Sequence, residues 1–430
     1  MTRLDPGAPL PSVLVVTTCW WPSLARFAHL LQEGGCRVSV LCPPGHPVRA
    51  APVSAVFDQS GLRPLRALSR AIERARPVYI VPGDDRAVGH LHRLYRTGSP
   101  VERALIARSL GAPENYPVST SRALFLRAAA EVGLPTAAGT RLDTVADLHD
   151  WMARADPPWV LKADGTWGGS GVAITECPRA ALSAFRELRR EPRLSVALKR
   201  VIINRDLFPL GDLLGKPRSA VSAQRYISGQ PGNLALMCRD GEVLASLVVE
   251  AVTCCGATGP AIIARVVDRP DLVSGAARLA RHLGLSGFIG LDFMVDEFGA
   301  AWIVEMNPRY TPLCNIRLAD GRDVLGAFLR ALTGRVARAP NPASAGLIAH
   351  FPLAWHWSRA DERLALCYQD IPWDQPALTE AMLQPTWPER QPLAKALAAI
   401  QRSLGLAASS PPKPAHTAPW LAGGSPDRAR

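Results

Sequence analysis

The chain has 430 residues, of which 48% are hydrophobic and 20% are charged. This length allows two or three domains with sizeable cores, and this composition excludes wholesale disorder. The formal net charge of +12 favours an acidic partner, for which nucleotide phosphates and carboxylates qualify. Because no basic run with interleaved aromatic residues accompanies this charge, we expect no nucleic-acid partner.

The nine cysteines are scattered along the chain and form no Cys-x-x-Cys motif. This pattern predicts reduced thiols, as in a cytoplasm, and favours neither a disulfide framework nor a zinc site. The first apolar run, residues 13–16, is too short for a signal peptide, and no run reaches the length of a membrane span. We therefore expect a cytoplasmic protein that does not engage a membrane.

The N-terminal part alternates between strand and helix patterns. Short apolar runs rich in β-branched residues predict buried strands over 13–18, 38–42 and 78–85, and helical patterns separate them over 23–33 and 62–76. This order predicts an open, Rossmann-like parallel sheet. The turn after the first strand reads TTCWWP and lacks GxGxxG, which argues against a dinucleotide site. Asp84 and Asp85 end the third run, where a helix N-cap is the favoured role and a ligand contact the alternative.

The middle of the chain predicts a helix and then mostly antiparallel strands. The helix covers 120–132, with Thr120 or Ser121 as its N-cap. Further strands are expected up to Lys162, from 172, over 220–229, and in hairpins over 234–249 and 290–309, with a helix from about 276 to 283 between the hairpins. Regularity weakens beyond 334, and the Pro- and Ala-rich tail over 407–430 should be disordered.

The stretch LKADGTWGGSG, residues 161–171, combines a strand-borne lysine with a glycine-rich loop. Such a loop can bring several backbone N–H groups around one anion while Lys162 supplies a positive charge. The lysine precedes the glycines, so this is not a Walker A loop. An ordinary hairpin with a solvated lysine explains this stretch equally well.

The hairpin GLDFMVDEFGAAWIVEMNPR, residues 290–309, carries a second candidate site. If Asp296 pairs with Ala301, Asp292 lies directly opposite Glu305, and Asn307 follows on the same face. Two facing carboxylates among apolar neighbours repel each other, and a magnesium ion bound by hard oxygen ligands would resolve the conflict. The alternatives are a one-residue slip of the hairpin or neutralisation by a nearby arginine.

In order and spacing, the lysine strand, GTWGGSGV (165–172) and IVEMNPR (303–309) resemble the ATP-grasp superfamily, above all its carbamoyl phosphate synthase and biotin carboxylase branch. The resemblance covers about 120–335 and extends more weakly toward the N-terminus. It implies a fold of mixed α/β and α+β class, in which a Rossmann-like pre-ATP-grasp domain over 10–117 precedes a two-subdomain ATP-grasp domain over 118–335. A C-terminal extension over 336–406 would lie on the substrate side.

The resemblance also implies roles for single residues. Lys162 and Arg309 would be catalytic, the first on the ATP phosphates and the second on developing negative charge or the substrate carboxylate. Magnesium, or manganese in its place, would bind Asp292, Glu305 and Asn307. The contacts implied for ATP are Arg122, Lys162, Gly168, Gly169, Ser170, Gly171, Gln224, Tyr226 and Ile227.

The segment that would meet adenine, QRYISG (224–229), departs from the family pattern. Arg225 stands at a position that is often acidic, and the usual ribose-binding carboxylate is not apparent, with Asn233 as a candidate replacement. These departures bear on nucleotide affinity and identity more than on the phosphate and metal sites.

The reaction implied by the resemblance is ligation. An ATP-dependent ligase would activate a carboxylate as an acyl phosphate and join it to an amine, with magnesium as cofactor and small molecules as substrates; dimers are common among similar proteins. Phosphoryl transfer of this kind needs alignment and charge neutralisation more than a protein nucleophile. Two alternatives remain: a phosphotransferase that acts on a hydroxyl, and a non-catalytic nucleotide-binding regulator.

Overall fold

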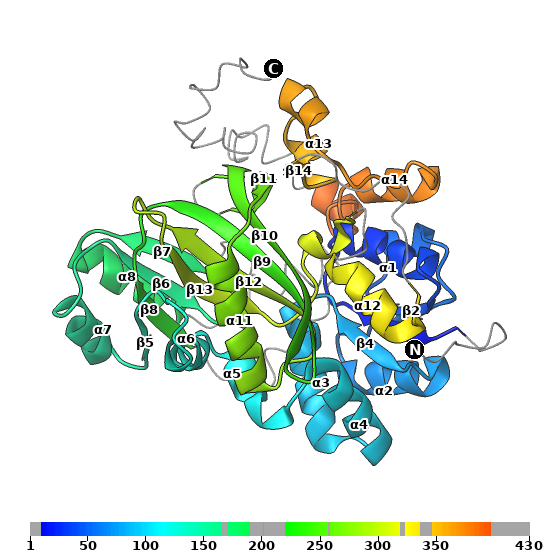
Figure 1. Ribbon diagram of the computed structural model, residues 1–430, viewed down its shortest axis with the longest axis horizontal. Coiled ribbons are helices and arrows are strands. Elements are labelled where there is room, and N and C mark those ends of the chain that lie inside the picture. Colours follow the sequence, from blue (N-terminus) through cyan, green and yellow to red (C-terminus); the bar gives the residue numbers. More distant parts are fainter. Residues whose placement is uncertain are drawn as a thin grey trace.

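The computed structural model describes residues 10–165, 171–189, 201, 220–256, 259–318, 323–335 and 346–396. These residues form three β-sheets with helices between and around them (Figure 1). Positions 168–170 of the predicted glycine loop and the predicted disordered tail, 407–430, lie outside the described residues. None of the described helices is long and apolar enough to cross a membrane.

The N-terminal part is a parallel sheet with strand order β3-β2-β1-β4, which confirms the predicted Rossmann-like arrangement. Its strands are β1 (Ser12–Val16), β2 (Arg37–Cys42), β3 (Ala55–Asp58) and β4 (Tyr79–Pro82), and its helices are α1 (Ser23–Glu33), α2 (Pro64–Ala75), α3 (Asp85–Thr97) and α4 (Pro100–Leu110). Strand β3 was not predicted: it is short, lies at the sheet edge and is only partly buried, so that its apolar pattern is weak.

Asp84 caps helix α3, as the favoured interpretation of the sequence held. Its carboxylate accepts a hydrogen bond from the backbone N–H of Ala87 at 2.9 Å and from the hydroxyls of Thr17 and Thr18 at 2.8 Å each. Asp84 is buried, and its carboxylate accepts hydrogen bonds both from the residues that follow β1 and from the helix that it caps.

A second, antiparallel sheet has the order β5-β8-β6-β7 and carries the predicted lysine. Its strands are β5 (Gly139–Leu142), β6 (Trp159–Ala163), β7 (Val172–Thr175) and β8 (Val221–Arg225), and helices α7 (Val145–Met152) and α8 (Pro178–Leu188) pack against it. Figure 1 shows this sheet on one side of the large central sheet and the N-terminal layer on the other.

The large sheet is antiparallel with the order β13-β12-β9-β10-β11-β14. Its strands are β9 (Gln230–Arg239), β10 (Glu242–Cys254), β11 (Ala261–Val266), β12 (Gly287–Val295), β13 (Ala301–Asn307) and β14 (Leu347–Ala349). The predicted hairpins over 234–249 and 290–309 are confirmed. Helix α11 (Pro270–Leu283) begins six residues before the expected start, because Pro270 supplies a favourable first helical position.

Alternation along the strands assigns the two faces of this sheet. Leu234, Leu236 and Cys238 pack with α6 (Arg122–Glu131) and α11, whereas Ala235 and Met237 face α12 (Val324–Thr333) and the N-terminal layer. The latter core also contains residues of α1 and of α14 (Pro376–Leu383), so it joins the beginning, middle and end of the chain.

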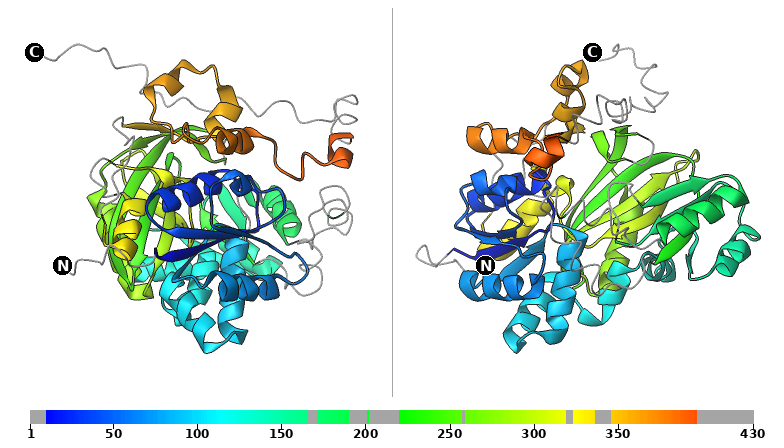
Figure 2. Two further views of the ribbon diagram at one scale, coloured as in Figure 1. Left: turned by 90° about the vertical axis from the view of Figure 1, so that its right-hand side faces the viewer. Right: turned by 180° about the vertical axis from the view of Figure 1, so that it is seen from behind.

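The remaining elements connect these layers. They are the 3-10 helices η1 (Pro47–Ala50), η2 (Pro113–Asn115), η3 (Pro312–Asn315) and η4 (Glu362–Leu366), together with helices α5 (Tyr116–Thr120) and α13 (Leu353–Ser358). The two views in Figure 2 place α14 beside α1, and α14 packs against α1 and η1, whereas α13 packs against β11.

Candidate functional site

The β12–β13 hairpin pairs Asp292 with Glu305, as the sequence predicted. Asn307 pairs with Gly290, and its amide donates to Asp292 Oδ2 at 3.1 Å, which confirms that both side chains share one face. Because Leu291, next to Asp292, belongs to the core on the opposite face, the two carboxylates point toward the N-terminal layer. The alternative of a one-residue slip does not occur at this position.

The register at the turn of this hairpin corrects the prediction. Val295, and not Asp296, pairs with Ala301. A β-bulge at Val304 absorbs the one-residue difference, and this restores the pairing of Asp292 with Glu305. The predicted pair was therefore right although the pairing from which it was inferred was wrong by one residue.

Asp292 lies in an environment that disfavours its charge. Burial, followed by the nearby charge of Glu305, raises its pKa, while hydrogen bonds from Asn233 and Asn307 oppose the shift. Asn233, on the neighbouring strand β9, donates through Nδ2 to Asp292 Oδ1. Its own Oδ1 is buried and accepts no hydrogen bond from the described residues. Two carboxylates and an unsatisfied amide oxygen thus share the site, and such hard oxygen atoms suit a divalent cation.

Arg122 compensates part of this negative charge. It is the first residue of α6, and Ser121 is its N-cap, as the sequence allowed. Its guanidinium contacts Glu305 Oε1 at 2.5 Å and Asp164 Oδ1 at 3.1 Å. The sequence also allowed a nearby arginine to neutralise the carboxylate pair. Arg122 does so at one oxygen of Glu305. Arg122 lies beside the predicted metal ligand, where it can contact either that carboxylate or an incoming phosphate.

Lys162 lies in β6 and is buried. Burial lowers the pKa of its ammonium group to about 8, although Glu305 and Asp292 act in the opposite direction. Across the strand pair lies Ser222, whose hydroxyl is buried and has no hydrogen-bond partner among the described residues. A buried ammonium group near two carboxylates, with no ion pair of its own in the described part of the chain, is suited to meet an anionic ligand.

Arg309 joins the candidate metal site to the N-terminal layer. It donates from Nη2 to Asn307 Oδ1 at 2.9 Å and from Nε to Asp85 Oδ1, at the start of α3, at 3.0 Å. The ring of Trp21 lies 4.8 Å from its guanidinium carbon, and Nη1 donates to the carbonyl of Tyr310. Burial lowers the pKa of Arg309, but its acidic neighbours, Asp85 first, outweigh this and raise it overall.

The remaining predicted ATP contacts lie around β8 and the loop after β6. Gln224 is buried, and its side-chain amide donates to the carbonyl of Val304, the bulged residue, at 3.1 Å. Tyr226 is exposed and Ile227 is partly buried. Gly171 accepts a hydrogen bond from the N–H of Ala163 at 2.9 Å, which aligns the end of the glycine loop with the lysine strand.

The structure brings three further residues to this site: Asp164, which was not predicted, and Asp85 and Asn233, for which the sequence suggested other roles. Asp164 and Asp85 each pair with a predicted arginine, and Asn233 lies beside Asp292 instead of serving only as a candidate ribose contact. Asp164 stands two residues after Lys162, so the strand motif already contained that signal. The contacts of Asp85 and Asn233 depend on tertiary packing.

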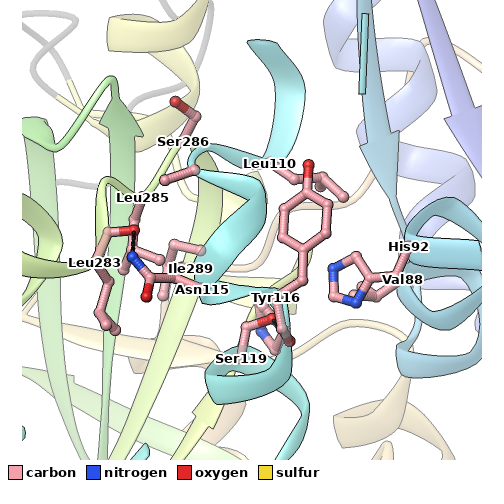
Figure 3. Close-up of a pocket in the computed structure, with 12 residues that line it drawn as sticks. Val88, His92, Leu110, Asn115, Tyr116, Ser119, Leu283, Leu285, Ser286 and Ile289 are labelled. Atoms are coloured by element: carbon pink, nitrogen blue, oxygen red, sulfur yellow. Dashed lines mark hydrogen bonds between the residues drawn. The ribbon is translucent and has the colours of Figure 1, made fainter. Parts of the chain in front are cut away.

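Two pockets of the described structure lie away from this site. One, of about 10 Å³, lies between α3, α5 and β12, where His92 stacks on Tyr116 with ring centroids 4.1 Å apart (Figure 3). It is no larger than one water molecule needs, and none of the predicted site residues lines it. A groove of about 810 Å³ between α2 and α4 contains none of them either.

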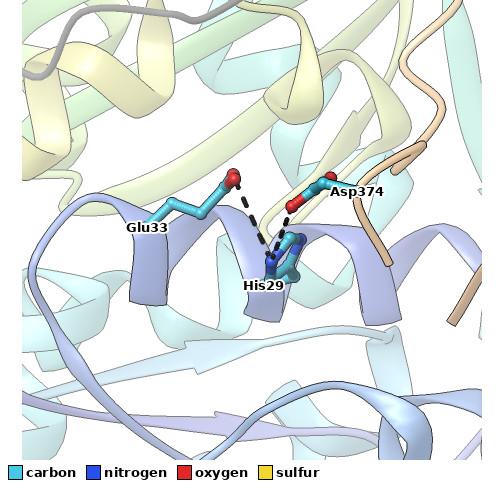
Figure 4. Close-up of side chains that lie close together, drawn as sticks. All are labelled: His29, Glu33 and Asp374. Carbon is cyan, nitrogen blue, oxygen red and sulfur yellow. Dashed lines mark ion pairs between the residues drawn. The ribbon is translucent and has the colours of Figure 1, made fainter. Parts of the chain in front are cut away.

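A histidine and two carboxylates form another cluster of metal-ligand type. His29, Glu33 and Asp374 lie close together at the junction of α1 and the C-terminal segment (Figure 4). Arginine only donates hydrogen bonds, so the contact of 2.8 Å from Arg26 Nη1 makes His29 Nδ1 an acceptor and leaves the proton on Nε2. This protonated nitrogen faces Glu33 and Asp374 at 3.9 Å each, so the cluster holds a proton where a metal ion would need a lone pair.

The comparisons with known proteins agree on the type of fold. Residues 214–312 match the family model of the ATP-grasp domain. The chain therefore has the ATP-grasp fold and carries an ATP-grasp domain. The match covers β8 to β13 and includes the carboxylate pair and Arg309, whereas Lys162 lies before it.

Solved structures agree on the fold at low sequence identity. The biotin carboxylase domain of 2-oxoglutarate carboxylase from Hydrogenobacter thermophilus, a dimer in complex with MgADP and bicarbonate, has a TM-score of 0.56 and 16% identity over 78% of this chain and 72% of that one. N5-carboxyaminoimidazole ribonucleotide synthetase with ADP has a TM-score of 0.56 and 15% identity, over 77% and 80%. An L-amino acid ligase from Bacillus licheniformis reaches 0.50 and 12%, over 76% and 75%. No curated protein sequence matches the chain.

Proposed function

We propose that the protein is a magnesium-dependent ATP ligase that activates a carboxylate as an acyl phosphate and transfers the acyl group to an amine. The observation that carries this proposal is the convergence of Lys162, Arg122 and the Asp292–Glu305 pair, which Asn307 and Arg309 extend toward the N-terminal sheet. This arrangement supplies several cations for phosphates and hard oxygen ligands for one metal ion.

The residues would divide the chemistry among themselves. Asp292, Glu305 and Asn307 would hold magnesium, and the unsatisfied Oδ1 of Asn233 is a further ligand candidate. Magnesium would neutralise the phosphate charge. Lys162 and Arg122 would bind phosphate oxygens, with Gly168, Gly169, Ser170 and Gly171 as the lid, and the segment from Gln224 to Ile227 would meet the adenine.

Arg309 would orient the carboxylate substrate. An oxygen of that carboxylate attacks the γ-phosphorus, and the bond from phosphorus to the bridging oxygen breaks, so its electron pair leaves with ADP. The amine then attacks the acyl carbon; a C–N bond forms and inorganic phosphate departs. Arg309 lies beside Asn307, so a carboxylate bound to it adjoins the candidate metal site.

Magnesium-dependent ATP turnover against pooled carboxylic acids, with hydroxylamine as a general amine, tests this function. We expect ADP, phosphate and an acyl hydroxamate with particular acids, and loss of all three in Glu305→Ala. Phosphorylation of a hydroxyl compound without ligation would identify a phosphotransferase instead. Tight ATP binding without turnover in any pool would identify a nucleotide-binding regulator.

A further inference from the structure

The start of α3 presents two adjacent carboxylates with different surroundings. Asp84 is buried, and both of its oxygens accept hydrogen bonds from the end of β1 or from the helix backbone. Asp85, the next residue, uses Oδ1 for Arg309 and accepts no further hydrogen bond from the described residues. Its side chain is 27% exposed. Asp84 is thus committed to the fold, whereas Asp85 keeps one oxygen available.

Arg309 likewise keeps donors available. A guanidinium carries five N–H groups. Arg309 donates three hydrogen bonds within the described chain, to Asp85, Asn307 and Tyr310. The ring of Trp21 covers its face and leaves its edge for further contacts. Two N–H groups of this buried side chain, one on Nη1 and one on Nη2, thus have no acceptor among the described residues, while Nε of the same guanidinium holds Asp85.

The unused oxygen of Asp85 is unexpected in a site that would bind ATP and a second anion. Asp85 pairs with Arg309 and lies in the first turn of α3, at the positive end of the helix. Its charge would repel a simple carboxylate substrate that approaches Arg309. A substrate with a cationic group beside its carboxylate would turn this repulsion into attraction, because the two charges of Asp85 and Arg309 match the two charges of a zwitterion.

We propose that the acyl donor of this protein is an amino acid, and that Asp85 is the residue that selects it. This inference rests on the ligase function proposed above. The substrate carboxylate contacts the two remaining N–H groups of Arg309, and its ammonium group contacts the free oxygen of Asp85. An ammonium group held by a carboxylate keeps its proton and has no lone pair for attack. The bound amino acid is therefore activated at its carboxylate, and the attacking amine comes from a second molecule.

The experiment compares two matched pools, with MgATP and hydroxylamine present in both. One contains the proteinogenic L-amino acids, and the other contains the carboxylic acids with the same side chains but no amino group. ADP and hydroxamate are measured. We expect about 10- to 100-fold higher kcat/KM with the preferred amino acid than with its des-amino counterpart, from one charge-assisted hydrogen bond.

Variants of Asp85 separate selection of the substrate from support of Arg309. Asp85→Asn should raise KM for the amino acid about 10-fold or more. It should lower KM for the des-amino counterpart, because the repulsion by Asp85 is removed, and should leave the affinity for MgATP unchanged. Asp85→Glu should recover part of the preference. Asp271→Asn is the matched control, because Asp271 also lies in the first turn of a helix and pairs with an arginine, Arg269, at 3.0 Å.

Three outcomes would overturn the inference while leaving the ligase intact. The first is turnover of des-amino acids in preference to amino acids. The second is an equal rise in KM for both classes in Asp85→Asn, which would make Asp85 a support for Arg309 only. The third is ADP formation from an amino acid only when a separate carboxylic acid is added, which would make the amino acid the acceptor. Inactivity of both pools would instead contradict the ligase function and the inference with it.

Discussion

Lys162 combines a positive charge with burial, and the conflict between them has a measurable consequence. Its pKa is lowered to about 8, chiefly by burial. Because the unfolded chain binds this proton up to the usual pKa near 10.5, the group lowers stability below pH 8 and this loss disappears as the pH rises toward 10.5. Lys162 forms no ion pair with the described residues, and the oxygens of a bound phosphate would supply its counter-charge.

Nucleotide binding should therefore take up protons near pH 8. At that pH roughly half of the Lys162 side chains lack a proton, and phosphate binding should restore it, so we expect uptake of about half a proton per site. Titration calorimetry of Mg-AMPPNP in buffers with different ionisation enthalpies measures this number. Lys162→Arg should bind nucleotide with no uptake from this residue, because arginine stays protonated. Equal uptake in the variant would contradict the assignment.

Asp292 shows the same conflict with negative charge. Its raised pKa means that the ionised form is disfavoured in the folded protein. Asp292→Asn removes the repulsion from Glu305, and Asn233 can turn its amide to present the unsatisfied oxygen to the new side chain. In EDTA at pH 7 we expect the variant to be more stable by about 1 kcal/mol in urea denaturation.

The same substitution should weaken magnesium-nucleotide binding, because it removes a hard anionic ligand. Asp271→Asn, which alters an exposed carboxylate on α11, is the control and should change neither property. A destabilised Asp292→Asn with unchanged nucleotide affinity would show that Asp292 is a structural residue.

At the scale of elements, the bulge in β13 decides what the hairpin presents. The extra residue, Val304, returns Glu305 to the position opposite Asp292 and leaves a carbonyl that β12 does not bind. Gln224, on β8 of the other sheet, donates to this carbonyl at 3.1 Å. The bulge therefore sets the geometry of the candidate metal site, and its carbonyl also links the two sheets.

Removing this contact should cost stability at the junction of the sheets. In Gln224→Leu the partly buried Val304 loses the donor to its carbonyl, and we expect a loss of about 1 kcal/mol in urea denaturation. Gln230→Leu is a useful comparison, because Gln230 also donates to a backbone carbonyl, that of Ala251, but within the large sheet. Only the change at Gln224 should also weaken nucleotide binding. Equal effects on binding would argue that the junction does not position the site.

At the scale of the whole molecule, one core joins segments that are far apart in the sequence. Residues from α1, the large sheet, α12 and α14 share it. A buried ion pair also joins these distant segments: Arg26 on α1 donates to Asp370 at 3.0 Å, across 344 residues of sequence. Burial raises the pKa of Asp370 to about 6 although Arg26 opposes the shift.

Loss of Arg26 should release the C-terminal segment. Arg26→Met would leave the Asp370 carboxylate buried without its counter-ion, and we expect a loss of about 3 kcal/mol at pH 7. Arg26 lowers the pKa of Asp370, so its removal raises that pKa further above 6; the loss should therefore shrink as the pH falls toward 6 and stay constant below it, where both folded proteins hold the proton. Urea denaturation measures the stability, and limited proteolysis measures release of the segment after residue 346.

The control for this experiment is Arg49→Met. Arg49 pairs with Asp58 at the protein surface, so its removal should change stability by less than about 1 kcal/mol. A similar loss in both variants, or a pH-independent loss in Arg26→Met, would contradict the role assigned to the buried pair.

The sequence by itself determined the local features of this protein. The parallel N-terminal sheet, the caps at Ser121 and Asp84, and the antiparallel hairpins follow from patterns within about ten residues. The motifs around Lys162 and Glu305 were sufficient to recognise the resemblance to the ATP-grasp superfamily. The spacing of charged residues along a strand sets which of them share a face, so these motifs also predicted the facing carboxylates.

Tertiary structure alone decided how these charges are paired. Arg122 meets Glu305 across 183 residues, and Arg309 meets Asp85 across 224. The bulge at Val304 and the position of Asn233 beside Asp292 also appear only once strands β9, β12 and β13 are aligned. The physical reason is that apolar burial brings whole faces together without specifying partners. The choice among arginines and carboxylates then depends on distances and desolvation that arise only after packing.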